Sequence, residues 1–118
     1  IDVYQQSVQD EGLTNALVGA ARAGVKVRVL MMPFPFGPKS DPNIPNQKQM
    51  REAGIEVGLA THLYIHAKLM IVDGQKMYVG SSNFYTPTLD GARELGVIVQ
   101  NTDQIKRVQE VFQGDWKR

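Results

Sequence analysis

The sequence contains no cysteine, no long apolar run and almost no net charge. The absence of cysteine excludes a disulfide framework and any zinc site built on thiolates. No apolar run approaches the ~20 residues that a membrane-spanning helix needs. The formal net charge is +1, from 13 basic and 12 acidic residues that are scattered along the chain. The sequence therefore lacks the basic stripe of a dedicated nucleic-acid-binding protein.

The length and apolar content fit one globular domain. A chain of 118 residues with 42% hydrophobic content can bury a modest core, so we expect a single domain over residues 1–118. The chain begins with Ile1 rather than methionine, no signal peptide begins there, and the residue reads as the middle of a strand. We therefore expect an N-terminal truncation. Any targeting segment would be lost with it, so the location stays open, including a membrane-associated or exported one.

Alternating strand and helix patterns predict the fold class. A strand is expected at residues 1–4, followed by a helix over about residues 11–23. Asp10 is the candidate N-cap of this helix, and Gly24 ends it. A second strand over residues 25–31 completes a strand–helix–strand unit with parallel pairing. The prediction is an α/β fold with a mixed, largely parallel sheet flanked by helices.

The remaining elements follow from the same patterns. We expect a short helix over residues 46–53, a buried strand over residues 55–59 and a central strand over residues 95–99. A last helix is expected after the cap residue Thr102. Its core stripe is expected to consist of Ile105, Val108, Val111 and Phe112. Trp116 is expected to close the core.

A proline-rich segment over residues 32–45 interrupts the regular elements. Prolines at this density prevent helix and sheet hydrogen bonding, which predicts an ordered loop or a flexible flap. Phe34 and Phe36 lie within it. We expect them to pack the loop onto the core, and the alternative is a lipid-facing lip beside the site.

The stretch over residues 66–94 holds most of the chemically active side chains, in the pattern H-x-K-x4-D-x6-G-S-x-N. Every second side chain of a strand points to the same face, so His66 and Lys68 are expected to reach one ligand together. The pair Asp73–Gly74 predicts a hairpin turn, after which residues 77–81 return along the first strand. The hairpin therefore brings the two ends of this pattern together.

The side chains in this pattern suit a phosphate group. Lys68 supplies positive charge, and Ser81 and Asn83 supply hydrogen-bond donors. An imidazole such as that of His66 can attack phosphorus or protonate a leaving oxygen. Taken singly, these residues also fit structural roles, for example a packed strand histidine or an edge lysine. The joint spacing favours a site.

A metal site is a second interpretation of the histidines. His62 and His66 are the only two histidines, and they are four residues apart. That spacing can bind zinc on a helix, but this run reads as extended and only carboxylates could complete the ligand set. No metal is therefore expected. Regular strand spacing would place His62 beside the same cleft as His66.

The pattern resembles the HKD signature of the phospholipase D superfamily. The matching residues are His66, Lys68, Asp73, Gly80, Ser81 and Asn83. The resemblance implies half of a phospholipase D-like fold, in which His66 is catalytic. It also implies that Lys68 and Asn83 hold phosphate oxygens with help from Ser81.

Two acidic residues complete the site that the resemblance implies. Asp73 would support the architecture of the motif more than touch the substrate. Glu94 stands where the family has an acid that orients a catalytic histidine, and this carboxylate would favour the charged imidazolium. Residues 93–99 are more similar to the phospholipase and cardiolipin synthase branch than to the small endonucleases.

The motif occurs once in this chain. The family uses two copies around one site: one histidine forms a phosphohistidine and the other protonates the leaving alcohol, without a cofactor. The resemblance therefore implies a second half, supplied by an identical copy in a homodimer or by a missing part of the same polypeptide. In the C-terminal half of a two-motif enzyme, His66 would be the acid rather than the nucleophile.

Three functions stay open. A phospholipase D-like phosphodiesterase or phosphatidyl transferase acting on a phospholipid is favoured. A metal-independent endonuclease of the same superfamily is the second. The near-neutral charge argues against nucleic acid, although a single phosphodiester can be held locally. The third is an inactive half-domain that serves as a binding or structural module.

Overall fold

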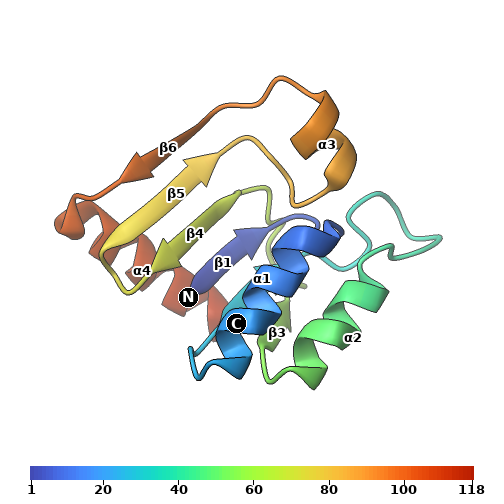
Figure 1. The fold of residues 1–118 in the computed structure, drawn as a ribbon, viewed down its shortest axis with the longest axis horizontal. Helices are drawn as coiled ribbons and strands as arrows, with labels where there is room; N and C mark the ends of the chain where they lie inside the picture. The colour runs from blue at the N-terminus through green and yellow to red at the C-terminus, as the bar shows by residue number, and fades with distance from the viewer.

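The first half of the chain forms three parallel strands and two helices in the computed structural model, which describes residues 1–118 (Figure 1). The strands are β1 (Asp2–Gln5), β2 (Arg28–Met31) and β3 (Glu56–Leu59), and the helices are α1 (Glu11–Arg22) and α2 (Ile44–Glu52). β1 pairs with β2 and β2 with β3, each in parallel. This confirms the predicted strand–helix–strand unit.

The second half is antiparallel. Its elements are β4 (Leu69–Val72), β5 (Lys76–Gly80), α3 (Thr86–Gly91), β6 (Gly96–Val99) and α4 (Thr102–Trp116). The turn between β4 and β5 has positive φ angles of 54° at Asp73 and 63° at Gly74. Positive φ at both central residues is the requirement of the type I′ hairpin turn that the sequence predicts here.

All six strands belong to one sheet with the order β3-β2-β1-β4-β5-β6. The α/β fold with a mixed sheet flanked by helices is confirmed. The expected excess of parallel pairing is not found: two pairings are parallel and three antiparallel, because β4 to β6 run alternately up and down. Figure 1 shows α1 and α2 on one face of the sheet and α4 on the other. None of the helices combines the length and apolar character needed to cross a membrane.

The helices bury a separate hydrophobic cluster on each face, because neighbouring strand residues point in opposite directions. The cluster under α1 and α2 contains Val3, Val8, Leu17, Val18, Val27, Val29, Met31, Met50, Ile55 and Phe84. The cluster under α4 contains Tyr4, Leu30, Ile65, Leu69, Ile71, Met77, Ile105 and Phe112. β1 and β2 contribute to both clusters, so the central strands are covered on both faces.

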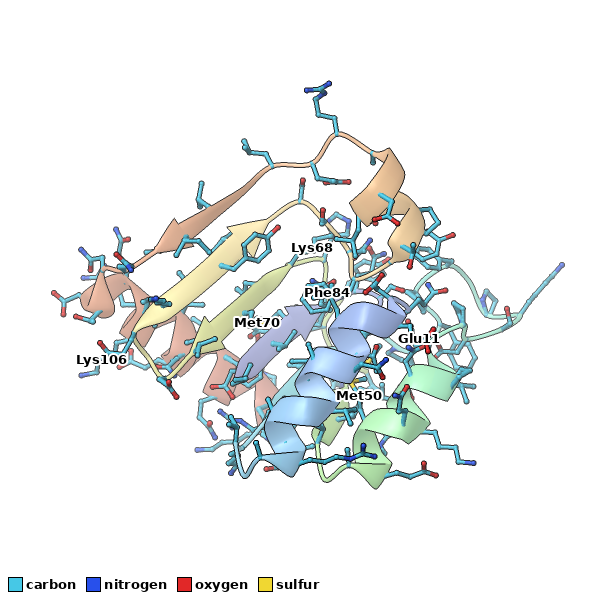
Figure 2. All side chains as sticks on the ribbon, in the orientation of Figure 1. Glu11, Met50, Lys68, Met70, Phe84 and Lys106 are labelled. Carbon is cyan, nitrogen blue, oxygen red and sulfur yellow. The ribbon has the colours of Figure 1, made fainter.

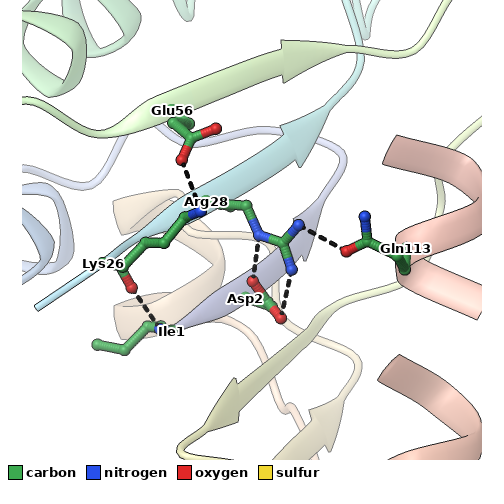
Figure 3. A network of polar contacts seen from close by, with 6 residues as sticks. All are labelled: Ile1, Asp2, Lys26, Arg28, Glu56 and Gln113. Carbon is green, nitrogen blue, oxygen red and sulfur yellow. Dashed lines mark hydrogen bonds and ion pairs between the residues drawn. The ribbon is translucent and has the colours of Figure 1, made fainter. Parts of the chain in front are cut away.

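A polar network joins β1 to β2 beside α4 (Figure 3). The Arg28 guanidinium donates to both Asp2 carboxylate oxygens, at 2.7 and 2.9 Å, and to the Gln113 side-chain oxygen at 2.8 Å. The guanidinium carbon also lies 5.0 Å from the Phe112 ring centroid and 5.4 Å from that of Trp116. A bidentate pair covered by aromatic rings fixes the register of β2 on β1 and holds α4 against both.

β6 corrects one expectation about the sheet. The sequence predicts a central strand over residues 95–99, but β6 is an edge strand. Leu95, Val97 and Ile98 are 78%, 55% and 64% exposed. β-branched composition shows that a segment suits a sheet, but it does not determine how many neighbours the strand has. β3, expected to be buried, is the edge strand on the opposite side.

Side-chain positions in α4 and in the proline-rich loop also differ from expectation. Asn101 rather than Thr102 caps α4, and its side chain accepts a hydrogen bond from the Gln104 N–H at 3.1 Å. Val111 faces solvent although it fits the helical stripe. In the loop, Phe34 and Phe36 are 50% and 61% exposed, so they do not pack onto the core. The exposure of these side chains depends on how each segment is oriented against its neighbours, which local periodicity does not determine.

One close packing arrangement lies at the ends of β5 and β6. Gly80 and Gly96 face each other across the two strands, and the Tyr78 ring lies over both. A Cβ at Gly80 would collide with the Tyr78 hydroxyl oxygen, and one at Gly96 would collide with the Tyr78 ring. Both positions therefore require glycine while Tyr78 occupies this place.

Candidate active site

Residues of the predicted site gather at the end of the sheet where β1 ends and β4 begins. Tyr4 of β1 pairs with Leu69 of β4. The Gly80 N–H donates to the Lys68 carbonyl at 3.0 Å, which extends the β4–β5 ladder by one bond. Figure 2 shows Lys68 at this end of the molecule, far from Lys106 on α4. The start of β4 and the end of β5 therefore meet here.

His66 lies outside the strand that the sequence predicts for it. β4 begins at Leu69, and the Ile65 N–H donates to the Met32 sulfur at 3.0 Å rather than to a neighbouring strand. Strand alternation therefore does not place His66 beside Lys68. A direct contact does: the Lys68 Nζ donates to the His66 backbone carbonyl at 2.7 Å.

Lys68 is a buried cation. Its residue is 7% exposed, and no carboxylate lies within ion-pair distance of its Nζ. Burial lowers the pKa of Lys68, and the negative charge of Glu94 acts in the opposite direction. A buried ammonium with one backbone acceptor has two N–H groups left for an anionic ligand. The position thus favours binding of a negatively charged group.

The lowered pKa of Lys68 makes a prediction about stability. Between its folded-state pKa and the ordinary value of 10.5, the unfolded chain binds more protons, so stability rises with pH through that window. We expect Lys68→Met to unfold at higher urea than the wild type near pH 7, because an uncompensated buried charge is removed. This advantage is expected to shrink as the pH approaches 10.5.

Urea unfolding at two pH values checks this prediction. Lys76→Met is the matched control, because Lys76 is exposed at the start of β5. We expect no comparable pH-dependent change in its midpoint. The prediction would be contradicted if Lys68→Met were less stable than the wild type near pH 7 and at least as stable as the wild type near pH 10.

Ser81 and Glu94 form a second part of the site. The Ser81 Oγ donates to the Glu94 carboxylate, and it accepts from the Leu95 N–H at 3.1 Å. The Ser81 N–H also donates to the Leu95 carbonyl at 3.0 Å. No hydrogen bond or ion pair joins Glu94 to His66. The structure therefore brings Glu94 to Ser81, but not to the histidine of its own chain.

Asn83 lies in a third group, whose other members, Gln6 and Tyr64, are not part of the predicted site. The Asn83 Nδ2 donates to the Gln6 Oε1 at 3.3 Å, and the Gln6 Nε2 donates to the Tyr64 hydroxyl at 2.8 Å. The Tyr64 ring stacks on the His66 ring at a centroid distance of 6.5 Å. A single polar residue at the end of a strand gives little local indication of a site, but three consecutive buried polar residues where β1 ends, Gln5, Gln6 and Ser7, are a usable pattern.

Asp73 lies apart from these groups. It is an exposed turn residue at the opposite end of β4 from Lys68. Its left-handed backbone conformation is one that aspartate tolerates better than most residues. Asp73 is therefore separated from Lys68 by the length of β4.

His62 does not share the cleft of His66. His62 lines a small pocket with Gly58 and Trp116. His66 lines a different groove, against α4. The bend at residues 61–63 breaks the even spacing on which the expectation depended. No group of three or more His, Cys, Asp or Glu side chains comes together as a metal site would require.

Two grooves flank the site. The groove beside His66 has a volume of about 400 Å³ and is mainly apolar, with Leu63, Leu69, Val108 and Val111 in its wall. The other groove, of about 700 Å³, lies between the proline-rich loop and the segment after Asn83 and includes Lys39, Phe36 and Tyr85. Of the two grooves, only the one beside His66 includes a residue of the predicted site.

Comparison with known families gives a match over nearly the whole chain. The family described as "Cardiolipin synthase, PLD-like domain" matches residues 1–116. The rat (Rattus norvegicus) 5'-3' exonuclease PLD3 is 30% identical over 109 residues, which are 92% of this chain and 22% of that protein. A cardiolipin synthase of Geobacillus sp. (strain WCH70) is 27% identical over 121 residues, 93% of this chain and 22% of that protein. The chain thus spans about a fifth of these relatives.

Solved structures show the same fold. The phospholipase D family member Nuc from Salmonella typhimurium superposes with a TM-score of 0.87 at 24% identity, over 98% of this chain and 76% of Nuc. NucT from Helicobacter pylori gives a TM-score of 0.81 at 17% identity, over 98% of this chain and 77% of NucT. At these identities the likeness concerns the fold, and it agrees with the family match.

Proposed function

We propose, from the premise that this chain belongs to the phospholipase D-like domain family, that it cleaves or transfers a phosphodiester through a phosphohistidine intermediate. The observation that carries the proposal is the buried, unpaired ammonium of Lys68 bonded to the backbone of an exposed histidine, His66. A buried cation without a carboxylate partner is costly unless a ligand supplies the negative charge. A phosphoryl oxygen would supply it.

Each residue of the motif has a role in this proposal. Lys68 and Asn83 would hold the phosphoryl oxygens, and Ser81 would assist, so charge that develops on those oxygens meets fixed donors. The Lys68 charge at ~4 Å from such an oxygen would contribute ~4 kcal/mol at an effective dielectric constant of ~20. Asp73 would keep the hairpin in register, away from the substrate.

The chemistry would proceed in two displacements. An imidazole nitrogen attacks phosphorus, the bond to the leaving alcohol breaks, and a second imidazolium gives its proton to the departing oxygen. Water or another alcohol then attacks the phosphohistidine while the second imidazole takes its proton, and the first histidine is released. His66 would be the nucleophile or the acid of this sequence.

The second imidazole would come from a second half of the enzyme. A copy of this chain in a homodimer, or another part of a longer polypeptide, could supply it. Glu94 is held by Ser81 and does not contact the chain's own His66. We therefore propose that Glu94 is available to orient the histidine of the second half, with His66 served by the acid of that half.

A phospholipid is the substrate that the grooves favour. The mainly apolar groove beside His66 suits the glycerol and acyl part of a lipid, whose phosphate would then lie next to the His66 side chain. A nuclease is the second candidate, because the rat relative is named a 5'-3' exonuclease. The groove with Phe36, Tyr85 and Lys39 would suit a stacked base and a backbone phosphate.

Hydrolysis assays with three substrates test the proposal. We expect turnover of bis(p-nitrophenyl) phosphate, faster turnover of phosphatidylglycerol vesicles than of single-stranded DNA, and unchanged rates in EDTA. The reverse preference would select the nuclease. Loss of activity in EDTA with rescue by a divalent cation would contradict the mechanism. A protein that is a strict monomer and inactive on all three substrates would instead be a binding or structural half-domain.

A further inference from the structure

Two buried side-chain atoms in the structure have no hydrogen-bond partner, Asn43 Nδ2 and Asn83 Oδ1. The second belongs to the candidate active site. A buried polar atom without a partner is uncommon, because its lost hydration is not replaced. The atom therefore marks a place where a ligand or a different orientation of the amide would supply a bond.

The amide of Asn83 is held in place by Gln6. Gln6 is 7% exposed, and its side chain lies between Asn83 and Tyr64, with contacts of 3.3 and 2.8 Å. In this arrangement Asn83 donates to Gln6, and Gln6 donates to the Tyr64 hydroxyl. The Tyr64 hydroxyl in turn donates to the Pro35 carbonyl at 3.4 Å. With this direction of donation, the Asn83 oxygen is buried without a partner.

Reversing both amides puts a donor instead of an acceptor at the unpartnered position, without moving any heavy atom far. The two ends of an amide are nearly equal in shape, so their assignment follows from the hydrogen-bond network. After reversal the Tyr64 hydroxyl donates to Gln6, the Gln6 nitrogen donates to the Asn83 oxygen, and only the long contact to Pro35 is lost. The Asn83 NH₂ group then occupies the unpartnered position.

We infer that Gln6 is a positioning residue that turns the Asn83 NH₂ group toward a bound phosphoryl oxygen, and that Tyr64 fixes the orientation of Gln6. This inference rests on the proposed function. Tyr64 also stacks on His66, so the phosphate donor and the imidazole are held by one connected group. Glutamine suits the central position because it donates to one neighbour and accepts from the other, which glutamate and methionine do not.

A double-mutant cycle tests the inference on the full protein. We expect Gln6→Met to lower kcat/KM for bis(p-nitrophenyl) phosphate about tenfold, the size of one charge-assisted hydrogen bond. In the Asn83→Ala background the same change is expected to have no further effect, because Gln6 acts through Asn83. Equal losses in both backgrounds, or no loss in either, would overturn the inference.

Two further variants separate positioning from stability. Gln47→Met removes an equally buried amide, which hydrogen-bonds to Asp41 away from the site, so it is expected to lower stability but not kcat/KM. Tyr64→Phe changes a side chain that is 59% exposed and removes only the hydroxyl. Tyr64→Phe is expected to lower kcat/KM less than Gln6→Met does, and to have no effect in the Gln6→Met background. If Tyr64→Phe lowers kcat/KM equally in both backgrounds, Tyr64 does not act through Gln6.

A binding readout keeps the inference testable without turnover. In ¹⁵N-labelled protein the side-chain amide resonance of Asn83 is expected to shift on titration with inorganic phosphate, and the shift is expected to weaken in Gln6→Met. An Asn83 resonance that ignores phosphate would overturn the inference even in an active enzyme. A response to phosphate in a protein that cleaves no phosphodiester would leave the positioning role intact and refute the proposed function.

Discussion

Replacing His66 by alanine is expected to lower phosphodiesterase activity by about 10³-fold or more and to leave the fold intact. The imidazole is the group that the proposed mechanism uses to attack phosphorus or to protonate the leaving oxygen. Its side chain is exposed and makes no hydrogen bond within the chain, so its removal costs little stability. Rates of bis(p-nitrophenyl) phosphate hydrolysis and urea midpoints measure the two parts of this prediction.

His62→Ala is the matched control, because it removes the chain's other imidazole from a neighbouring exposed position in a different pocket. We expect its activity to stay within about twofold of the wild type. Turnover by His66→Ala at the wild-type rate would show that this histidine is not part of the reaction. Equal losses in both variants would show that the loop over residues 61–67, rather than one imidazole, is what matters.

Replacing Phe112 by alanine is expected to lower the free energy of unfolding by about 3–5 kcal/mol. Phe112 is 0% exposed, meets the Tyr4 ring edge-on at 4.9 Å and stacks on Trp116 at 5.8 Å. Its loss would leave a cavity under the sheet and remove one of the two aromatic rings that cover the Arg28 guanidinium. Against a total stability of about 5–15 kcal/mol, this change is large.

Val111→Ala is the control for this prediction, because its side chain is the next one along α4 and is 60% exposed. Surface truncations of this kind change stability by about 0.5 kcal/mol or less. Urea unfolding followed by circular dichroism measures both variants. A loss below about 1 kcal/mol for Phe112→Ala would mean that α4 packs less closely on the sheet than the structure shows.

Local chemistry made much of this fold predictable. The Asp73–Gly74 turn predicts its hairpin because few residues tolerate left-handed backbone angles, and the side chain of Asp10 accepts from the Leu13 N–H at 2.7 Å, as an N-cap does. The edge position of β6 was not predictable in the same way. Apolar β-branched residues such as Val97 occur in central and edge strands alike, and only the complete sheet order separates them.

In the candidate site, too, local spacing identified some residues, whereas contacts between distant segments could not be predicted. The spacing of His66, Lys68 and Asn83 identified the motif, because a short stretch carries all of it. Gln6 was missed because 77 positions separate it from Asn83, and nothing local links the two. Glu94 was included in the candidate site by its position in the pattern, but its contact with Ser81 rather than His66 depends on how β6 lies against β5.

The pairing of β1 with β4 has a consequence for dividing the protein. This junction joins the parallel strands of residues 1–59 to the antiparallel strands of residues 69–99, and each part is contiguous in the chain. The contact between Gln6 and Asn83 crosses it, and so does the one between Gln6 and Tyr64. A chain cut near residue 60 would therefore give two fragments that each keep neighbouring strands, while the connected group of Gln6, Asn83 and Tyr64 would be complete only after the two reassociate.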